Sequence, residues 1–116
     1  MRRNRTQYMD PIKRGTTPTL KFNHPYGPGV LDLVECGYIT FVQRGEVVFE
    51  KRFDGDGVEV LPECILVDLN REETLQLTTV DLCRAQILFD LKYGKVAESG
   101  IYKIPVHESL KGGEIR

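Results

Sequence analysis

The chain has 116 residues with 16 Lys and Arg against 17 Asp and Glu, and 41% of it is hydrophobic. That length suits one domain, which can bury a core without metals or disulfides. No apolar run approaches the roughly 20 residues that a membrane span needs, and the N-terminal residues lack the apolar stretch of a secretory signal. Composition therefore excludes a membrane protein, a disordered chain and a multidomain enzyme.

Charge is unevenly divided along the chain. Residues 1–21 hold six bases and one acid, a formal charge of +5, while residues 22–116 hold ten bases and sixteen acids, a formal charge of −6. We therefore predict a basic, extended N-terminal arm, residues 1–17, ahead of an acidic body. Pro11 and Pro18 disfavour a helix there. Such an arm suits nucleic acid, an acidic neighbouring protein or another copy of the chain as its partner.

The first strand is expected over residues 19–22, before a loop over 23–29 that contains two prolines and two glycines. A hairpin follows. Residues 37–43 and 47–53 are both rich in β-branched and aromatic side chains, and Arg44-Gly45 between them suits a two-residue turn.

Alternation along this hairpin predicts which side chains are buried. The core-facing side chains are Ile39 and Phe41 on the first strand and Val47, Phe49 and Phe53 on the second, whereas Glu50 and Arg52 face water. A turn over residues 54–57 comes next. It lacks the 12-residue ligand pattern of a calcium loop.

A strand over residues 64–69 should bury Ile65, Val67 and Leu69. Asn70 can then cap a helix of one or two turns, because Glu73 stands three residues later, as in a capping box. The adjacent acids Glu72 and Glu73 suit the first turn of that helix through its dipole.

The clearest alternation runs over residues 83–91, with a turn at Tyr93-Gly94 after it. The final strand is expected over residues 97–107. Its inward side chains are Tyr102, Ile104 and Val106, with Lys103 outside. Pro105 cannot donate to a ladder, so this part of the strand should lie at a sheet edge.

These elements predict an all-β fold, an antiparallel immunoglobulin-like β-sandwich of six to seven strands with one short helical turn. A small barrel is the alternative. The predicted organisation is a basic arm over 1–17, a sandwich domain over 18–107 and a flexible tail over 108–116. Trp is absent from the sequence, so the Cys…Trp…Cys pattern of antibody domains is missing.

The sequence does not favour a catalytic or metal-binding role. Three cysteines (Cys36, Cys64 and Cys83) and two histidines (His24 and His107) lack the close spacing of metal ligands, and an odd cysteine count argues against a disulfide framework. Nucleophile elbows, phosphate loops and dinucleotide fingerprints are missing. We predict no enzyme, no catalytic residue, no cofactor, no metal and no small-molecule substrate.

Several stretches nevertheless resemble a known family. They are Arg14-Gly15-Thr16-Thr17-Pro18-Thr19, the run Tyr38 to Lys51, Glu72-Glu73-Thr74-Leu75 before the 83–91 strand, and Gly100-Ile101-Tyr102 to Val106. This order resembles small tail-module proteins of phages and prophages of Gram-positive bacteria, which are similar to the immunoglobulin-like N-terminal domain of phage baseplate upper proteins. The resemblance covers about residues 14–106, with Arg44-Gly45 where such sequences often have Asn-Gly.

The resemblance implies a structural virion protein of a phage tail or baseplate, made in the bacterial host cytoplasm and located in the virion. It implies other virion proteins and copies of the chain itself as partners, and no membrane. A charged arm can reach into a neighbouring subunit and add affinity as it orders. The expected partner-contacting residues lie in the arm: Arg2, Arg3, Arg5, Tyr8, Lys13 and Arg14. Deletion of residues 1–13 should then leave a folded monomer that fails to assemble.

Two other functions stay open. A carbohydrate- or host-factor-binding module would use exposed aromatics, for which Tyr26, Tyr38 and Tyr93 are the candidates. A small nucleic-acid-binding regulator would use the arm. Tyr8 is the arm's single aromatic side chain, so bases would find little to stack on, and this regulator is the last of the three hypotheses.

Overall fold

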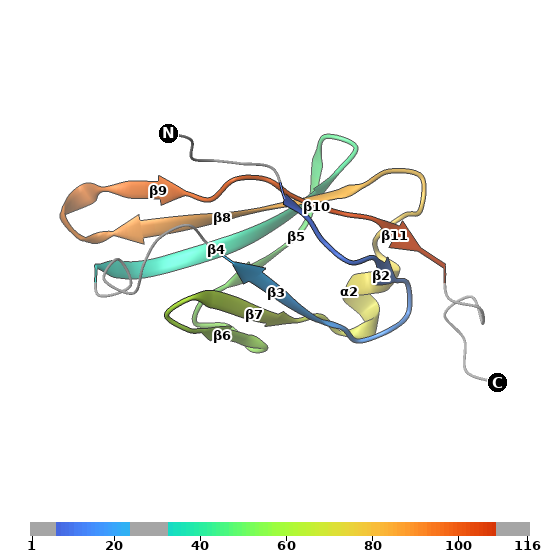
Figure 1. The fold of residues 1–116 in the computed structure, drawn as a ribbon, viewed down its shortest axis with the longest axis horizontal. Coiled ribbons are helices and arrows are strands. Elements are labelled where there is room, and N and C mark those ends of the chain that lie inside the picture. Colours follow the sequence, from blue (N-terminus) through green and yellow to red (C-terminus); the bar gives the residue numbers. More distant parts are fainter. Residues whose placement is uncertain (1–6, 24–32, 109–116) are drawn as a thin grey trace.

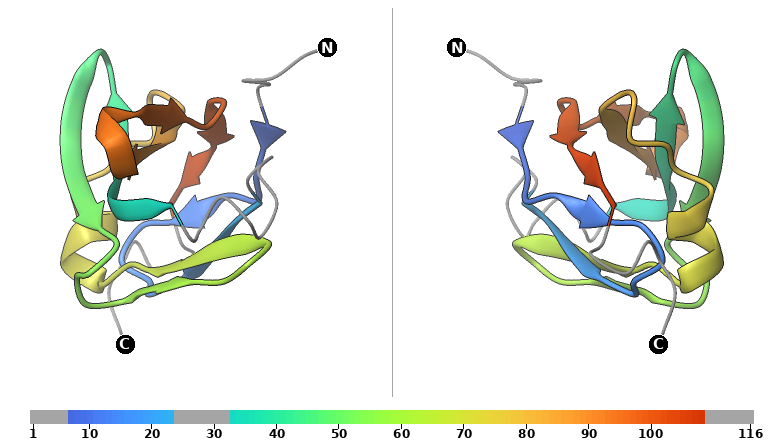
Figure 2. Two further views of the ribbon diagram at one scale, coloured as in Figure 1. Left: turned by 90° about the vertical axis from the view of Figure 1, so that its left-hand side faces the viewer. Right: turned by 90° about the vertical axis from the view of Figure 1, so that its right-hand side faces the viewer.

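The computed structural model describes residues 7–23 and 33–108. Most of these residues lie in strands, and the strands form two sheets that pack face to face, with a short two-stranded pairing near the C-terminal end (Figure 1; Figure 2). The chain is therefore an all-β sandwich, as the sequence predicts.

The larger sheet has the strand order β1-β10-β8-β4-β5, with β9 also paired to β8. It is antiparallel apart from β1 and β10, which run parallel. Its strands are β1 (Gln7–Tyr8), β4 (Val34–Gln43), β5 (Glu46–Arg52), β8 (Cys83–Leu91), β9 (Val96–Glu98) and β10 (Tyr102–Ile104).

The smaller sheet is antiparallel and has the order β3-β7-β6. Its strands are β3 (Thr19–Asn23), β6 (Val58–Val60) and β7 (Cys64–Asp68). A separate parallel pair joins β2 (Ile12–Lys13) to β11 (Val106–His107). Two short helical elements complete the described chain, α2 (Arg71–Leu75) and the 3₁₀ turn η1 (Lys92–Gly94).

The strand order is that of a variable-type immunoglobulin sandwich. In that notation β3, β7 and β6 correspond to strands B, E and D, and β4, β5 and β8 to strands C, C′ and F. Strand G is represented by β9, β10 and β11 in succession. The described residues form eleven strands, more than the six to seven predicted. The number is higher because this last strand is broken twice and because residues 7–13 add two strands.

Aromatic side chains join the two sheets at the centre of the core. The Phe22 ring on β3 makes edge-to-face contacts with Tyr102 and Phe41 of the opposite sheet, at centroid distances of 4.8 and 6.2 Å. Phe41 also stacks on Phe49 at 4.6 Å. Aromatic packing thus joins the sheets in a domain whose three cysteines are free.

The β8 alternation predicted from the sequence is confirmed. Cys83, Ala85, Ile87 and Phe89 are buried, while the side chains between them are half-buried on the outer face. The three core residues expected in the next strand are buried as well, Ile65 and Val67 on β7 and Leu69 directly after it.

The β4–β5 hairpin turns at Arg44-Gly45, as predicted, and both residues have left-handed backbone, with φ of 55° and 79°. The prediction that Val47 faces the core is wrong: its side chain is 61% exposed. A β-bulge shifts the register, so that Phe41 pairs with Phe49 and Val42 with Val47. The bulge turns Val48 toward the core in place of Val47.

Helix α2 begins with the capping box that the sequence predicts. The Asn70 side chain accepts from the Glu73 backbone N–H at 2.7 Å, and the Glu73 carboxylate accepts from the Asn70 backbone N–H at 2.9 Å. Lys51 of β5 adds an ion pair to Glu73 at 3.0 Å. Helix α2 lies in the connection that leads from β7 in one sheet to β8 in the other (Figure 1).

The prediction of an extended arm does not hold for residues 7–17. Here β1 pairs with β10 and β2 pairs with β11, so this segment adds to the strands of the sandwich. Ile12 is fully buried in the core. A single apolar residue in a polar run gives no periodicity, which is why the sequence pattern missed it. Residues 1–6 lie outside the described part of the chain.

The last predicted strand is divided into β9, β10 and β11. The first break occurs at Ser99, a buried residue whose hydroxyl accepts from the Ile87 N–H and donates to the Gly100 carbonyl. The second break is Pro105. Pro105 stands between β10, which lies between β8 and β1, and β11, which has β2 as its one described neighbour and so lies at an edge, as predicted for this part of the strand. The Pro105 carbonyl itself accepts from the Ile12 N–H at 2.8 Å.

Candidate functional site

The residues predicted to contact partners do not gather at one place. Tyr8 is 72% exposed on the outer face of the larger sheet, with the Lys103 ammonium 5.6 Å from its ring centroid. Lys13 is exposed on β2. Arg2, Arg3 and Arg5 lie outside the described residues.

The Arg14 side chain forms its hydrogen bonds within the molecule. Its guanidinium donates to the Leu75 and Leu77 carbonyls at 2.9 and 2.7 Å and to the Glu108 carboxylate at 2.9 Å. A cation at the C-terminal end of a helix satisfies carbonyls that have no helical partner and complements the helix dipole. Arg14 therefore clamps the end of α2, and its predicted contact with a partner stays a prediction.

The rest of the Arg14-to-Thr19 motif supports the same clamp. Gly15 has φ of 80°, which brings its N–H within 3.0 Å of the Thr74 hydroxyl. That buried hydroxyl donates to the Thr16 carbonyl at 2.9 Å. The motif that carries much of the family resemblance therefore has a structural role, because it docks the segment after β2 onto α2.

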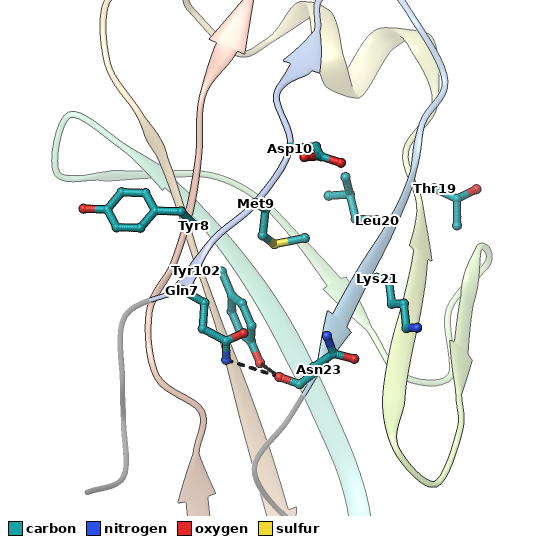
Figure 3. Close-up of a pocket in the computed structure, with 9 residues that line it drawn as sticks. All are labelled: Gln7, Tyr8, Met9, Asp10, Thr19, Leu20, Lys21, Asn23 and Tyr102. Atoms are coloured by element: carbon teal, nitrogen blue, oxygen red, sulfur yellow. Dashed lines mark hydrogen bonds between the residues drawn. The ribbon is translucent and has the colours of Figure 1, made fainter.

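A groove of about 350 Å³ opens between the two sheets on the side of the N-terminal segment. It exists because β1 and β3 are each the last strand of their sheet, so that two sheet edges face each other across it (Figure 3). Its volume is at the lower end of the range of ligand sites, roughly 300–1,000 Å³. The lining residues come from β1 and the residues after it, from β3 and from β10: Gln7, Tyr8, Met9, Asp10, Thr19, Leu20, Lys21, Asn23 and Tyr102.

One end of the groove is closed by hydrogen bonds between its walls. The Asn23 carbonyl on β3 accepts from the Tyr102 hydroxyl at 2.7 Å and from the Gln7 side-chain amide at 3.4 Å (Figure 3). Met9 and Leu20 provide apolar lining further along, and Asp10 lies near the Thr19 end. The groove thus has a polar closed end, an apolar middle and an acidic group at its other end.

Backbone groups of β3 point into the groove. The Leu69 N–H donates to the Pro18 carbonyl, and the register continues as Thr19 opposite Asp68. Hydrogen-bonded pairs alternate along an antiparallel ladder, so Leu20 also bonds to β7, and the N–H and C=O of Thr19 and Lys21 face away from it.

The opposite wall has the same property. The N–H groups of Gln7 and Met9 donate to carbonyls on the β10 side at 2.8 and 2.9 Å. The N–H of Tyr8 between them therefore points to the outer edge of β1. Sequence reasoning missed this groove, because β1 was not predicted and its edge could not be placed opposite β3.

A second hollow of about 500 Å³ lies beside the β4–β5 turn. Gln43 is buried at its base, where its amide donates to the Thr78 and Asp81 carbonyls at 2.9 and 2.8 Å and its oxygen accepts from the Thr78 N–H at 2.8 Å. The Asp81 carboxylate accepts from the Arg44 N–H at 2.8 Å. The bond from the Arg44 N–H, together with one from the Leu82 N–H, holds the pKa of Asp81 below its usual value. The bonds of Gln43 and Asp81 fix the loop after α2.

The titratable groups do not form a reactive centre in the described chain. Burial raises the pKa of the Cys83 thiol to about 12, so this sulfur is a poor nucleophile. Within residues 7–23 and 33–108, three or more His, Cys, Asp or Glu side chains do not converge on a point that could hold a metal ion. No helix described in these ranges is long and apolar enough to cross a membrane.

The aromatic side chains considered for sugar binding are spread over the molecule. Tyr38 lies on the outer face of β4 beneath the Arg52 guanidinium, 5.4 Å from the ring centroid. Arg52 pairs with Asp54 at 3.0 Å, and this bond lowers the pKa of the Asp54 carboxyl. Tyr93 is 88% exposed at the β8–β9 turn with φ of 66°. Tyr26 lies outside the described residues.

Comparison with known proteins adds little to this geometry. No protein-family model matches the chain, and no curated protein sequence matches it. Among solved structures, the V domain of amphioxus IgVJ-C2 is similar at 10% identity and a TM-score of 0.35, over 88% of this chain and 98% of that one. At that score the likeness carries no argument about function, and the strand order itself is the basis for the fold.

Proposed function

We propose that this chain is a structural assembly protein of a phage tail or baseplate, which binds copies of itself and neighbouring virion proteins. The observation that carries the assembly role is the groove with a sheet edge on each wall that no other described strand pairs with. Unpaired edges are templates for strands of other chains, and natural proteins usually cover or blunt them. The resemblance of residues 14–106 to small tail-module proteins supports the phage context.

Charge supports the same role. Residues 54–73 carry seven acids and one base, whereas Met1 to Thr6 carry three arginines and no acid. Charges of opposite sign on one chain favour encounters between copies. The proposal assigns the contact to Arg2, Arg3 and Arg5, since Arg14 is used internally.

The test is the mass of the full-length protein in solution, measured by native mass spectrometry and light scattering over a concentration series. We expect a discrete oligomer of the chain, and a smaller species when residues 1–6 are deleted. A matched variant that exchanges the three arginines for glutamines should behave like the deletion. A full-length chain that stays monomeric at every concentration, and fails to co-purify with virion proteins when made in an infected host, contradicts the proposal.

A carbohydrate-binding role has one observation in its favour, the exposed ring of Tyr93. Its test is a glycan array with the wild-type chain and Tyr93→Ala. A glycan bound by the wild type and lost in the variant would support it over the assembly role.

A further inference from the structure

We infer that the groove between β1 and β3 receives residues 1–6 of a neighbouring copy, which bind there as an added strand. This inference rests on the proposed assembly function and names the surface that the basic segment contacts. Among the strands of residues 7–23 and 33–108, none lies beyond either wall: β1 pairs with β10 and β3 with β7, and each is the last described strand of its sheet.

The hydrogen-bonding groups of both walls suit an extended chain. Thr19 and Lys21 present main-chain N–H and C=O groups from one side, and Tyr8 presents an N–H from the other. A strand laid between them satisfies both edges at once, which is how strand addition gains its affinity. The apolar Met9 and Leu20 lie where alternate side chains of that strand would rest.

Asp10 favours residues 1–6 as the occupant. Its carboxylate lines the groove near Thr19, and Lys21 lines the groove further along β3. In an extended strand, Arg3 and Arg5 project on the same side, about 6.6 Å apart. One of these guanidinium groups can therefore pair with the Asp10 carboxylate.

Length and connection favour a second copy over the chain's own segment. Six extended residues span about 20 Å, and the five residues of β3 span about 16 Å. In its own chain the segment joins β1 at Gln7, at the closed end of the groove. Gln7 is held there by its N–H to the Ile101 carbonyl and by its side chain to Asn23, so a reversal into the same groove would break these bonds.

The experiment is disulfide trapping between two singly substituted full-length chains in a Cys36→Ser background. One chain carries Arg3→Cys and an affinity tag, and the other carries Lys21→Cys. We expect a disulfide-linked heterodimer under mild oxidation, at least fivefold more abundant than with Glu59→Cys, a site that is also exposed, on β6 at the opposite edge of the same sheet. The yield should fall at least threefold with 0.5 M salt or with Asp10→Asn, because the contact is partly ionic.

The other outcomes either overturn this inference alone or overturn it together with the proposed function. Equal yields at positions 21 and 59 overturn the inference, as does an internal disulfide that forms in a dilute chain carrying both Arg3→Cys and Lys21→Cys. If the wild-type chain is an oligomer and the trapping fails, this inference alone is wrong. If the wild-type chain is a monomer throughout, the proposed function falls with it. Circular dichroism of each variant checks that the sandwich is intact.

Discussion

Gln43 stabilises a loop with a single side chain. It is 4% exposed and makes three hydrogen bonds with the backbone of Thr78 and Asp81. Its replacement by alanine would leave two carbonyls and one N–H without this partner in a part-buried setting, where each group costs toward the lower end of about 1–3 kcal/mol. We expect Gln43→Ala to lower the free energy of unfolding by about 3 kcal/mol in urea denaturation.

The control for that variant is Gln86→Ala on β8. Gln86 is half-buried and donates one bond, to the Ser99 carbonyl at 3.1 Å. The expected loss is at most about 1 kcal/mol. Equal losses for the two variants would mean that Gln43 contributes through its bulk and not through its three bonds.

The Cys83 thiol makes stability depend on alkaline pH. Because burial raises its pKa to about 12, the folded state keeps the proton that an unfolded chain releases near pH 9. The stabilisation is complete below pH 9 and is lost as the pH rises toward 12. Between pH 8 and 10.5 we expect wild type to lose about 2 kcal/mol more than Cys83→Ala, at 1.36 kcal/mol per pH unit. Urea denaturation at the two pH values measures it; parallel losses would contradict it.

At the scale of elements, the β4–β5 turn holds a non-glycine residue in a strained backbone conformation that another residue type would adopt more readily. Arg44 has φ of 55°, a left-handed conformation that asparagine adopts more readily than arginine. The Arg44 side chain forms no hydrogen bond or ion pair described here, whereas its backbone N–H bonds Asp81 and would be kept by asparagine. Arg44→Asn should therefore raise the free energy of unfolding by about 0.5–1 kcal/mol.

The matched variant in this turn is Gly45→Ala. Gly45 has φ of 79°, and nothing lies within 4 Å of the added Cβ, so the substitution tests backbone strain alone. We expect a loss of about 1 kcal/mol or more in the same urea measurement. A neutral Gly45→Ala would mean that the turn relaxes to another type and that the gain expected at Arg44 has no basis.

Elements with strong local signals were predictable from the sequence. The Asn70 capping box, the Arg44-Gly45 turn and the alternation of β8 each depend on residues close together in the chain, and each is confirmed. Features set by distant pairings were not predictable. The bulge that turns Val47 outward depends on the register between two strands, and β11 pairs with a parallel partner about ninety residues away.

The same limit applied to the candidate site. Basic residues in the N-terminal segment could be recognised from charge alone, but the groove requires that β1 and β3 lie at facing edges of two sheets. Ile12 and Met9 are isolated apolar residues among polar ones, so their burial becomes evident only when β10 and β11 are in place beside them. Local patterns carry no information about such a pairing.

At the scale of the whole molecule, the N-terminal segment has two parts with different roles. Residues 7–13 belong to the sandwich through β1, β2 and the buried Ile12, and residues 1–6 carry three arginines. The charge division seen in the sequence therefore does not coincide with the boundary of the fold. Deletions that end at different residues can separate folding from assembly.

Deletion of residues 1–6 should change the free energy of unfolding by less than about 0.5 kcal/mol, because it removes no buried side chain of the described core. Deletion of residues 1–13 should instead cost at least about 3 kcal/mol or abolish folding, since it removes Ile12 and the strands that cover β10 and β11. This replaces the expectation from sequence that the longer deletion leaves a folded monomer. Urea denaturation followed by circular dichroism measures both, with full-length Ile12→Ala, expected to cost about 2–5 kcal/mol, as the point of comparison. A 1–13 deletion as stable as the full chain would show that β1 and β2 are dispensable for the sandwich.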